Sequence, residues 1–257
     1  MILAIDIGNT HIKNGIFSGD KLLHSWRMSR EGNRTADEYG MTYLSFFKYL
    51  RLSLDEIEGI IVSSVVPTVD YTIEHLFQLY FPQAEPIFVG PGIKTGIRLR
   101  YNDPRELGAD RICNAVAAHA LYGGPCITVD FGTATTFGVI SEEGDFEGGV
   151  ICPGMKISLE ALVHSTAQLS TVELTRPERI LGKSTNHCIQ SGIVFGHVGQ
   201  VDAILEKLIE EIGGKKKPNL IATGGTAPLV VPASRYLDKI DTTLTLQGLR
   251  IIYERNA

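Results

Sequence analysis

Runs of apolar residues at two spacings predict strands at the start of the chain. Residues 2–8 form a short and almost wholly apolar run, which is typical of a buried strand. Residues 12–17 and 22–28 alternate apolar and polar positions, as half-buried strands do, and the turn residues Ser18-Gly19-Asp20 separate them. The chain is therefore predicted to open with three consecutive strands.

Helical spacing replaces strand spacing after Thr35. This threonine is a candidate N-cap, and Glu38 completes a capping box in front of a face of aromatic and leucine residues. Residues 60–66 are rich in β-branched side chains and predict a buried strand, residues 69–80 repeat with helical spacing, and residues 87–89 form a short strand. The first half of the chain thus has the predicted order β-β-β-α-β-α-β.

The second half begins with an alanine-rich helix, expected over residues 107–121. Residues 3–17, LAIDIGNTHIKNGIF, and residues 127–140, ITVDFGTATTFGVI, then share a strand, an aspartate, a glycine two positions later and a second strand. Asp6 and Asp130 are 124 positions apart, close to half of the 257 residues. A repeat at half length predicts two similar lobes that face one another across a cleft.

The remaining apolar patterns complete the second lobe. Helices are expected near residues 155–168 and 190–212, and a strand with a glycine-rich turn is expected over residues 220–226. The predicted fold class is α/β, with one domain over residues 1–104 and a second over residues 105–257.

Composition and charge narrow the class of protein. Hydrophobic residues make up 44% and charged residues 21% of the chain, which is ordinary for a globular protein. The formal net charge of −5 argues against a nucleic-acid partner and favours a small-molecule substrate. We expect neither secretion nor membrane insertion, because the N-terminus lacks a basic region and no run approaches the roughly 20 apolar residues of a membrane span. The four cysteines lack metal-ligand spacing and lie in apolar contexts typical of buried thiols, so a cytoplasmic location is expected.

The two Asp-x-Gly turns carry the first candidate chemistry. A carboxylate at a strand end, followed by a glycine that lets the main chain approach a ligand, suits a phosphate site with a metal ion. Asp6 could hold Mg²⁺ through water, while Asn9, Thr10 and Lys13 offer hydrogen bonds and a positive charge to a phosphoryl group. Aspartate and glycine are also common turn formers, but the recurrence of the turn at Asp130 favours two turns that enclose one polyphosphate.

These motifs carry a resemblance that covers essentially the whole chain. In order and spacing the chain resembles the type III pantothenate kinases at Asp6-Ile7-Gly8-Asn9-Thr10, Gly108-Ala109-Asp110-Arg111, Asp130-Phe131-Gly132-Thr133 and Gly182-Lys183-Ser184-Thr185. That family lies within the superfamily of acetate kinase, sugar kinases, Hsp70 and actin. The resemblance implies two ribonuclease-H-like lobes with ATP bound in the cleft between them, and phosphorylation of pantothenate as the first step of coenzyme A biosynthesis.

The resemblance also implies roles for the residues of the Gly-Ala-Asp-Arg motif. Asp110 would be the general base that takes the proton from the primary hydroxyl of pantothenate. Arg111 would bind the carboxylate or amide oxygens of the substrate through its planar guanidinium group. Gly108 and Ala109 would complete this part of the pantothenate pocket.

Two further substrate residues are implied, and one of them involves a second chain. Tyr101 would contact pantothenate, and Thr185 would complete the pocket of the other protomer in a homodimer. The sequence adds that Gly192, Gly196 and Gly199 lie close together on the helix that follows, where small residues let two helices approach closely.

The same resemblance implies the nucleotide and ion sites. The residues expected to bind ATP are Asp6, Ile7, Gly8, Asn9, Thr10, His11, Ile12, Lys13 and Thr133. Asp130 would bind a monovalent cation, K⁺ or ammonium, whereas Mg²⁺ would bind near Asp6 through water. Spacing alone does not separate that monovalent cation from a second Mg²⁺.

Structural explanations compete with each assignment. Asp110 is a suitable first-turn helix carboxylate, Arg111 a suitable surface ion-pair partner, and Thr185 a suitable helix N-cap. For the whole protein, the alternatives are a non-catalytic ATP-binding regulatory relative and an actin-like, polymer-forming ATPase. A positioned base favours the enzyme, because a binding module has no need for one.

Overall fold

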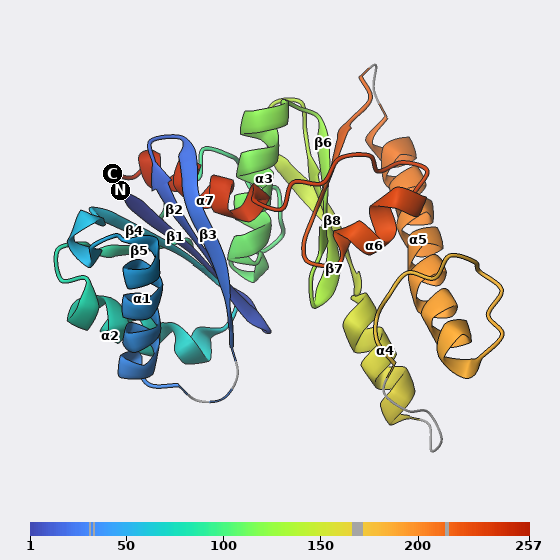
Figure 1. Ribbon diagram of the computed structural model, residues 1–257. Coiled ribbons are helices and arrows are strands. Elements are labelled where there is room, and N and C mark those ends of the chain that lie inside the picture. The colour runs from blue at the N-terminus through green and yellow to red at the C-terminus, as the bar shows by residue number, and fades with distance from the viewer. Residues whose placement is uncertain (31, 33, 166–171, 214–215) are drawn as a thin grey trace. The chain divides into compact units, whose positions relative to one another are not determined.

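The computed structural model describes residues 1–30, 32, 34–165, 172–213 and 216–257. The chain forms two compact units (Figure 1). The first unit comprises Met1–Ile97, Asn102–Ala117 and Thr245–Ala257, and the second comprises Arg98–Tyr101 and Ala118–Leu244. This division differs from a single boundary after residue 104, because the chain crosses from one unit to the other four times.

The first unit has the predicted element order. Its elements are β1 (Ile2–Ile7), β2 (His11–Ser18), β3 (Lys21–Ser29), α1 (Ala36–Leu50), a 3-10 turn (Leu54–Glu56), β4 (Gly59–Ser64), α2 (Pro67–Tyr80), β5 (Pro86–Phe88) and a second 3-10 turn (Pro104–Glu106). The strands form a five-stranded sheet in the order β3-β2-β1-β4-β5. β1 pairs antiparallel with β2 and parallel with β4, so the predicted β-β-β-α-β-α-β order of this half is confirmed.

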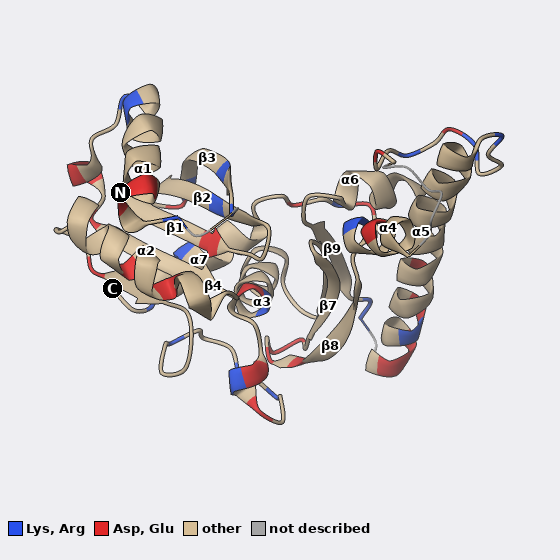
Figure 2. Cartoon of the chain, turned by 90° about the horizontal axis from the view of Figure 1, so that it is seen from below, with Lys and Arg blue, Asp and Glu red and all other residues tan. Residues whose placement is uncertain are grey.

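One face of the first sheet is covered by α1 and α2. Alternate residues of β1, namely Leu3, Ile5 and Ile7, pack into a hydrophobic core with Tyr43 of α1 and Phe77 of α2. The two helices lie side by side in both views (Figures 1 and 2).

The start of α1 confirms the predicted capping box. The Thr35 Oγ1 accepts a hydrogen bond from the Glu38 amide at 3.3 Å, and the Glu38 carboxylate accepts one from the Thr35 amide at 2.7 Å. This reciprocal pair fixes the point where the chain leaves β3 and enters the helix that covers the core.

The other face of the first sheet lies toward α3 (Ala109–Tyr122) and α7 (Leu244–Glu254). Within the first unit, the Thr245 hydroxyl of α7 donates a hydrogen bond of 2.8 Å to the Asn114 side chain of α3. A Cβ on Gly248 would overlap main-chain atoms of Cys113. The absent side chain at Gly248 therefore permits the close crossing of α7 and α3.

The second unit repeats the sheet with one strand fewer. Its elements are β6 (Cys126–Phe131), β7 (Ala134–Ile140), β8 (Phe146–Pro153), α4 (Met155–His164), α5 (Thr185–Ile212), β9 (Asn219–Thr223), α6 (Ala227–Val230) and a 3-10 turn (Val231–Ala233). The sheet order is β8-β7-β6-β9, with β6 parallel to β9. Where the first sheet has β5 beside β4, the described part of this unit has one parallel bridge beside β9, between Ala222 and Ile240. The predicted helix over 155–168 ends at His164, and residues 166–168 lie outside the described residues.

The long helix α5 covers the second sheet with one face only. Val194, Val198 and Val201 are buried in the core of this unit. Gly192, Gly196 and Gly199 lie on the exposed side, and a Cβ at any of them would meet open space within the chain. The apolar face is thus used inside the unit, while the small residues face outward.

Charge and cysteine exposure complete the description. Acidic and basic positions are interspersed along both units (Figure 2). Cys113, Cys126 and Cys152 are buried as expected, but Cys188 is exposed near the start of α5, so the prediction of a buried thiol was wrong there. No helix in the described ranges is long and apolar enough to cross a membrane.

Candidate functional site

The first candidate turn joins β1 to β2. The Gly8 amide donates a hydrogen bond of 3.0 Å to the His11 carbonyl, which closes the turn. Asp6 is buried, 5% exposed, and its carboxylate lies 3.4 Å from the Lys13 Nζ, its neighbour in the antiparallel register. The turn therefore brings a buried carboxylate and an ammonium group together just below an exposed main-chain loop.

Of the nine residues expected to bind ATP, the eight consecutive residues 6–13 are not equivalent. Ile7 and Ile12 are completely buried in the hydrophobic core, so they can offer a ligand only main-chain atoms. Asn9 and His11 are exposed at the tip of the turn. Arg30, which sequence analysis missed, braces this tip by donating from its Nε to the Asn9 carbonyl at 2.8 Å. No local motif marks Arg30, since the contact spans 21 residues.

The Gly-Ala-Asp-Arg motif lies at the start of α3, as predicted. The Arg111 amide donates a hydrogen bond of 2.8 Å to the Asp110 Oδ1, so the carboxylate folds back over the first turn of its own helix. A Cβ on Gly108 would lie 2.6 Å from that same oxygen. Glycine at this position therefore makes room for the carboxylate. Arg111 is buried, 8% exposed, so the alternative of a surface ion-pair arginine is wrong.

Cys113 lies one helical turn after Asp110, and its thiol also lies near Asp6. Burial raises the pKa of the Cys113 thiol, and the nearby carboxylates of Asp6 and Asp110 raise it further, while the Ser63 hydroxyl lowers it. The structure thus brings Asp6 and Asp110 to the same neutral thiol within the first unit, although they are 104 positions apart in the sequence.

The second unit holds the repeated turn. Asp130 is partly buried at the end of β6, while Gly132 and Thr133 are exposed at the tip. Gly224, with φ +95°, crosses directly over this turn, since a Cβ there would lie 2.5 Å from the Phe131 amide nitrogen and 2.6 Å from the Asp130 Oδ1. The glycine-rich turn after β9 therefore packs on the aspartate turn.

The Asp130 turn is tied to its surroundings on two sides. The amide and hydroxyl of Thr226 both donate to the Phe131 carbonyl, at 3.3 and 3.2 Å. The Gly154 amide, just before α4, donates to the Thr133 carbonyl at 3.1 Å. The main chain around the predicted cation site is thereby held by the turn after β9 and by the end of β8.

Tyr101 also belongs to the second unit. The Arg100 amide donates to the Phe146 carbonyl at 2.9 Å, and the Phe146 amide donates to the Arg98 carbonyl at 2.8 Å, so this segment runs along the start of β8. The Tyr101 ring, half-buried, lies 6.1 Å from the Phe146 ring between centroids. These contacts tie the position of Tyr101 to β8.

Thr185 is the first residue of α5 and is exposed. It is not the N-cap, because the Ser184 Oγ accepts the capping hydrogen bond from the His187 amide at 3.3 Å. The structural explanation considered for Thr185 is therefore wrong, and its side chain is available to a ligand or another chain.

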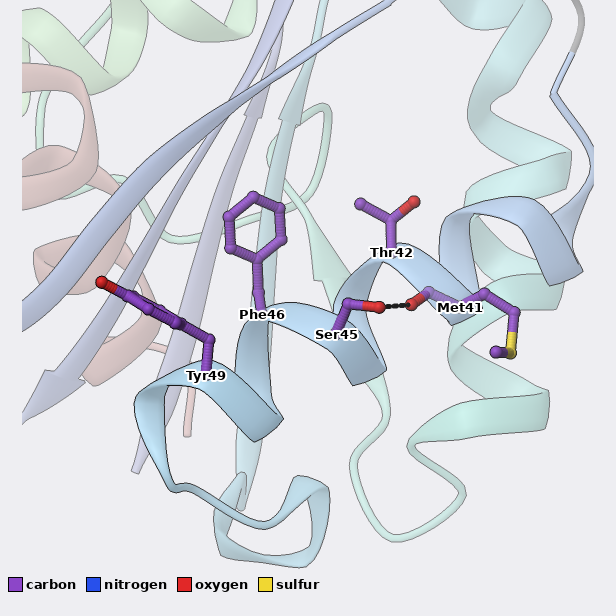
Figure 3. Close-up of a pocket in the computed structure, with 5 residues that line it drawn as sticks. All are labelled: Met41, Thr42, Ser45, Phe46 and Tyr49. Atoms are coloured by element: carbon purple, nitrogen blue, oxygen red, sulfur yellow. Dashed lines mark hydrogen bonds between the residues drawn. The ribbon is translucent and has the colours of Figure 1, made fainter.

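The described residues form no separate metal centre, and the groove on α1 lies apart from the predicted site residues. Among the described residues, no group of three or more His, Cys, Asp or Glu side chains is placed to hold a metal ion. An open groove of about 430 Å³ on α1 is lined by Met41, Thr42, Ser45, Phe46 and Tyr49 (Figure 3). It contains none of the predicted site residues.

Comparison with known proteins gives one family and one fold. The model of the type III pantothenate kinase family matches residues 2–207. A protein from Campylobacter jejuni assigned to the Baf family of transcriptional activators has a solved structure that is 20% identical, covers 99% of this chain and 98% of its own, and has a TM-score of 0.57.

Two other solved structures have the same fold at lower identity. The activator of 2-hydroxyisocaproyl-CoA dehydratase from Clostridium difficile, solved with bound ADPNP, is 14% identical, with 98% and 92% of the two chains covered and a TM-score of 0.54. A protein from Listeria monocytogenes assigned as an N-acetylmannosamine kinase is also 14% identical, with 99% of each chain covered and a TM-score of 0.54. The two-sheet α/β fold is thus that of the actin and sugar-kinase group, as predicted.

Proposed function

Because the chain belongs to the type III pantothenate kinase family, we propose that it transfers the γ-phosphoryl group of ATP to the primary hydroxyl of pantothenate, giving 4'-phosphopantothenate. The family and the fold are those of ATP-dependent phosphotransferases. The observation that carries the choice of substrate is the Gly-Ala-Asp-Arg motif, which stands at a helix start with its carboxylate held in place.

Asp110 acts in this proposal as the general base. Its hydrogen bond from the Arg111 amide orients one carboxylate oxygen and favours the charged form, and the helix N-terminus stabilises the same charge. A carboxylate is a far weaker base than an alkoxide, so its contribution is to hold the attacking hydroxyl and accept the proton as the O–P bond forms. The product is a phosphate ester, and ADP leaves.

Asp6 and Lys13 act on the nucleotide. The residues present fit Mg²⁺ bound through water rather than directly. Asp6 is a single buried carboxylate, and the ammonium group of Lys13 beside it limits the negative charge at that place. When bound, Mg²⁺ would neutralise charge on the phosphates. Asn9 and Thr10 then offer main-chain and side-chain donors at the tip of the turn, while the Gly8 amide closes the turn on the His11 carbonyl.

The second unit supplies the remaining proposed contacts. Thr133, exposed at the tip of its turn, binds ATP phosphate, and Asp130 binds K⁺ or ammonium. Tyr101 and the partner's exposed Thr185 contact pantothenate, which requires a homodimer. Support for that dimer comes from the exposed glycine face of α5, because Gly192, Gly196 and Gly199 offer no side chain of their own to the space beside them.

A second candidate function is a non-catalytic ATP-binding regulator. The observation that favours it is the likeness to the Campylobacter jejuni protein assigned to the Baf transcriptional activators. That likeness, at 20% identity, shows only the fold. A regulator also has no need for a carboxylate oriented as that of Asp110 is, so the kinase remains the first proposal.

The deciding experiment measures ADP release by the purified protein with Mg-ATP and K⁺. Pantothenate, N-acetylmannosamine, acetate and no acceptor are compared, and we expect release only with pantothenate. Release without any acceptor would indicate an ATPase, and no release with any acceptor, although ATP binds, would favour the regulator.

Asp110→Asn tests the proposed base. It should lower turnover about 10²-fold or more while leaving ATP affinity nearly unchanged. Glu106→Gln is the matched control, because Glu106 is an exposed carboxylate four residues earlier, and we expect it to retain normal turnover. Normal turnover in the Asp110 variant would contradict the assigned role.

A further inference from the structure

The duplicated fold places a buried hydroxyl beside each of the two aspartates. In the first unit Asp6 of β1 pairs in parallel register with Ser63 of β4. In the second unit Asp130 of β6 pairs in the same register with Thr223 of β9. Each hydroxyl thus occupies the same position relative to its carboxylate.

Both hydroxyls project from the same face of the sheet as the aspartate. Side chains alternate along a strand, so in-register residues of parallel neighbours share a face. In β4 the residue before Ser63, Val62, enters the core formed with α1 and α2, and in β9 the residue before Thr223, Ala222, enters the core formed with α5. Ser63 and Thr223 are therefore directed away from those cores and toward the aspartate side.

Neither hydroxyl has a hydrogen-bond partner among the described residues. Ser63 is 0% and Thr223 is 1% exposed, and both side-chain oxygens are completely shielded from solvent. The Ser63 hydroxyl lies close enough to the Cys113 thiol to lower the pKa of that thiol, but a thiol is a weak hydrogen-bonding group and no bond of normal geometry forms to the hydroxyl. A buried hydroxyl without a partner destabilises a protein, and native proteins satisfy such groups with ordered water or a bound ligand.

The same arrangement occurs in both units, which argues against chance. A hydroxyl occupies the register position next to the carboxylate in both β4 and β9, two strands with little other sequence in common.

We infer that Ser63 and Thr223 are positioning residues, each of which binds a buried water that also binds the neighbouring aspartate. The water holds the Asp6 carboxylate in the orientation used for hydrated Mg²⁺, and that of Asp130 in the orientation used for the monovalent cation. This inference rests on the proposed function, since it assigns those ions to the two carboxylates.

Removal of either hydroxyl should not lower the stability of the ligand-free protein. Ser63→Ala and Thr223→Val remove a buried hydroxyl that forms no hydrogen bond within the protein, so the ligand-free variants should unfold at the same temperature as the parent or a few degrees higher. The matched control is Ser64→Ala, which removes a hydroxyl that donates to Asp70 at 2.5 Å and accepts from the Val66 amide at 3.2 Å. That control should lower the unfolding temperature.

Although their stability should not fall, the same two variants should need higher ion concentrations for binding and activity. We expect Ser63→Ala to raise the Mg²⁺ concentration needed for half-maximal nucleotide binding about tenfold, and Thr223→Val to raise the corresponding K⁺ concentration for activity similarly. Ser64→Ala should change neither concentration. Thr223→Ser keeps the hydroxyl and should restore the K⁺ dependence.

Calorimetric titration of Mg-ATP without an acceptor separates this inference from the proposed function. If the parent protein binds no Mg-ATP, the proposed function fails and the inference with it. If the parent binds Mg-ATP but Ser63→Ala binds it with the same Mg²⁺ dependence, the inference is overturned while the kinase assignment stands. A ligand-free Ser63→Ala protein that loses as much stability as Ser64→Ala would also overturn it, because the hydroxyl would then have a hydrogen-bond partner within the protein rather than a water.

Discussion

A methyl group at Gly224 should destabilise the second unit, because this glycine lies against the main chain of the Asp130 turn. The residue has φ +95°, and the left-handed region costs a non-glycine residue about 1–2 kcal/mol. A Cβ would also lie 2.5 Å from the Phe131 nitrogen and 2.6 Å from the Asp130 Oδ1. The Phe131 nitrogen is main chain, so it cannot rotate away as a flexible side chain would.

The expected cost of Gly224→Ala follows from these terms. Relieving the overlap costs about 1–3 kcal/mol, as overpacking does elsewhere. Loss of glycine's freedom in the unfolded chain offsets about 0.4–1 kcal/mol of this. The net loss in free energy of unfolding should be about 2–4 kcal/mol, the largest part of it arising where the turn after β9 crosses the Asp130 turn.

Gly132→Ala is the matched control, because Gly132 belongs to the same Asp130 turn. A Cβ there would lie 3.5 Å from the Ala134 carbonyl oxygen and 3.7 Å from the Asp130 Oδ1, which is ordinary van der Waals contact, and its φ is not in the left-handed region. This variant should be within about 0.5 kcal/mol of the parent or slightly more stable.

Urea unfolding followed by far-UV circular dichroism measures both variants. With a slope of about 2 kcal/mol/M, the expected loss lowers the urea midpoint of Gly224→Ala by roughly 1–2 M. Fluorescence of Trp26, the single tryptophan, reports on the first unit and gives a separate signal. Equal midpoints for Gly224→Ala, Gly132→Ala and the parent would refute the close approach of the two turns.

Three shorter predictions follow from other parts of the structure. Activity should require K⁺ or ammonium and nearly disappear in sodium or Tris salts; equal rates with and without those ions would contradict the role of Asp130. Mixing an Asp110→Asn chain with a Thr185→Ala chain should restore part of the activity, because one pocket of each mixed dimer is intact; no recovery after verified subunit exchange would place Thr185 in its own chain's pocket. Gly248→Ala should lower the unfolding temperature despite the better helix propensity of alanine, since the methyl group overlaps the Cys113 main chain; a rise in that temperature would show that α7 does not cross α3 closely.

Local sequence determined the elements of the first sheet and their ends. Strand and helix spacing gave the order β-β-β-α-β-α-β, and Thr35 with Glu38 gave the start of α1, because these signals involve residues within one helical turn or one strand of each other. The two Asp-x-Gly turns and the Asp110 motif were also visible, since each occupies a few consecutive residues at a strand end or helix start.

Only the tertiary structure decided how distant segments combine. It assigned the start of α3 and residues 245–257 to the first unit, brought Arg30 to the Asn9 carbonyl and placed Ser63 beside Asp6. The sequence half-repeat could not show that the last strand of the second unit is reduced to a bridge at Ile240. Each of these features depends on contacts between residues far apart in the chain, and such contacts leave no periodic signal in the segments that make them.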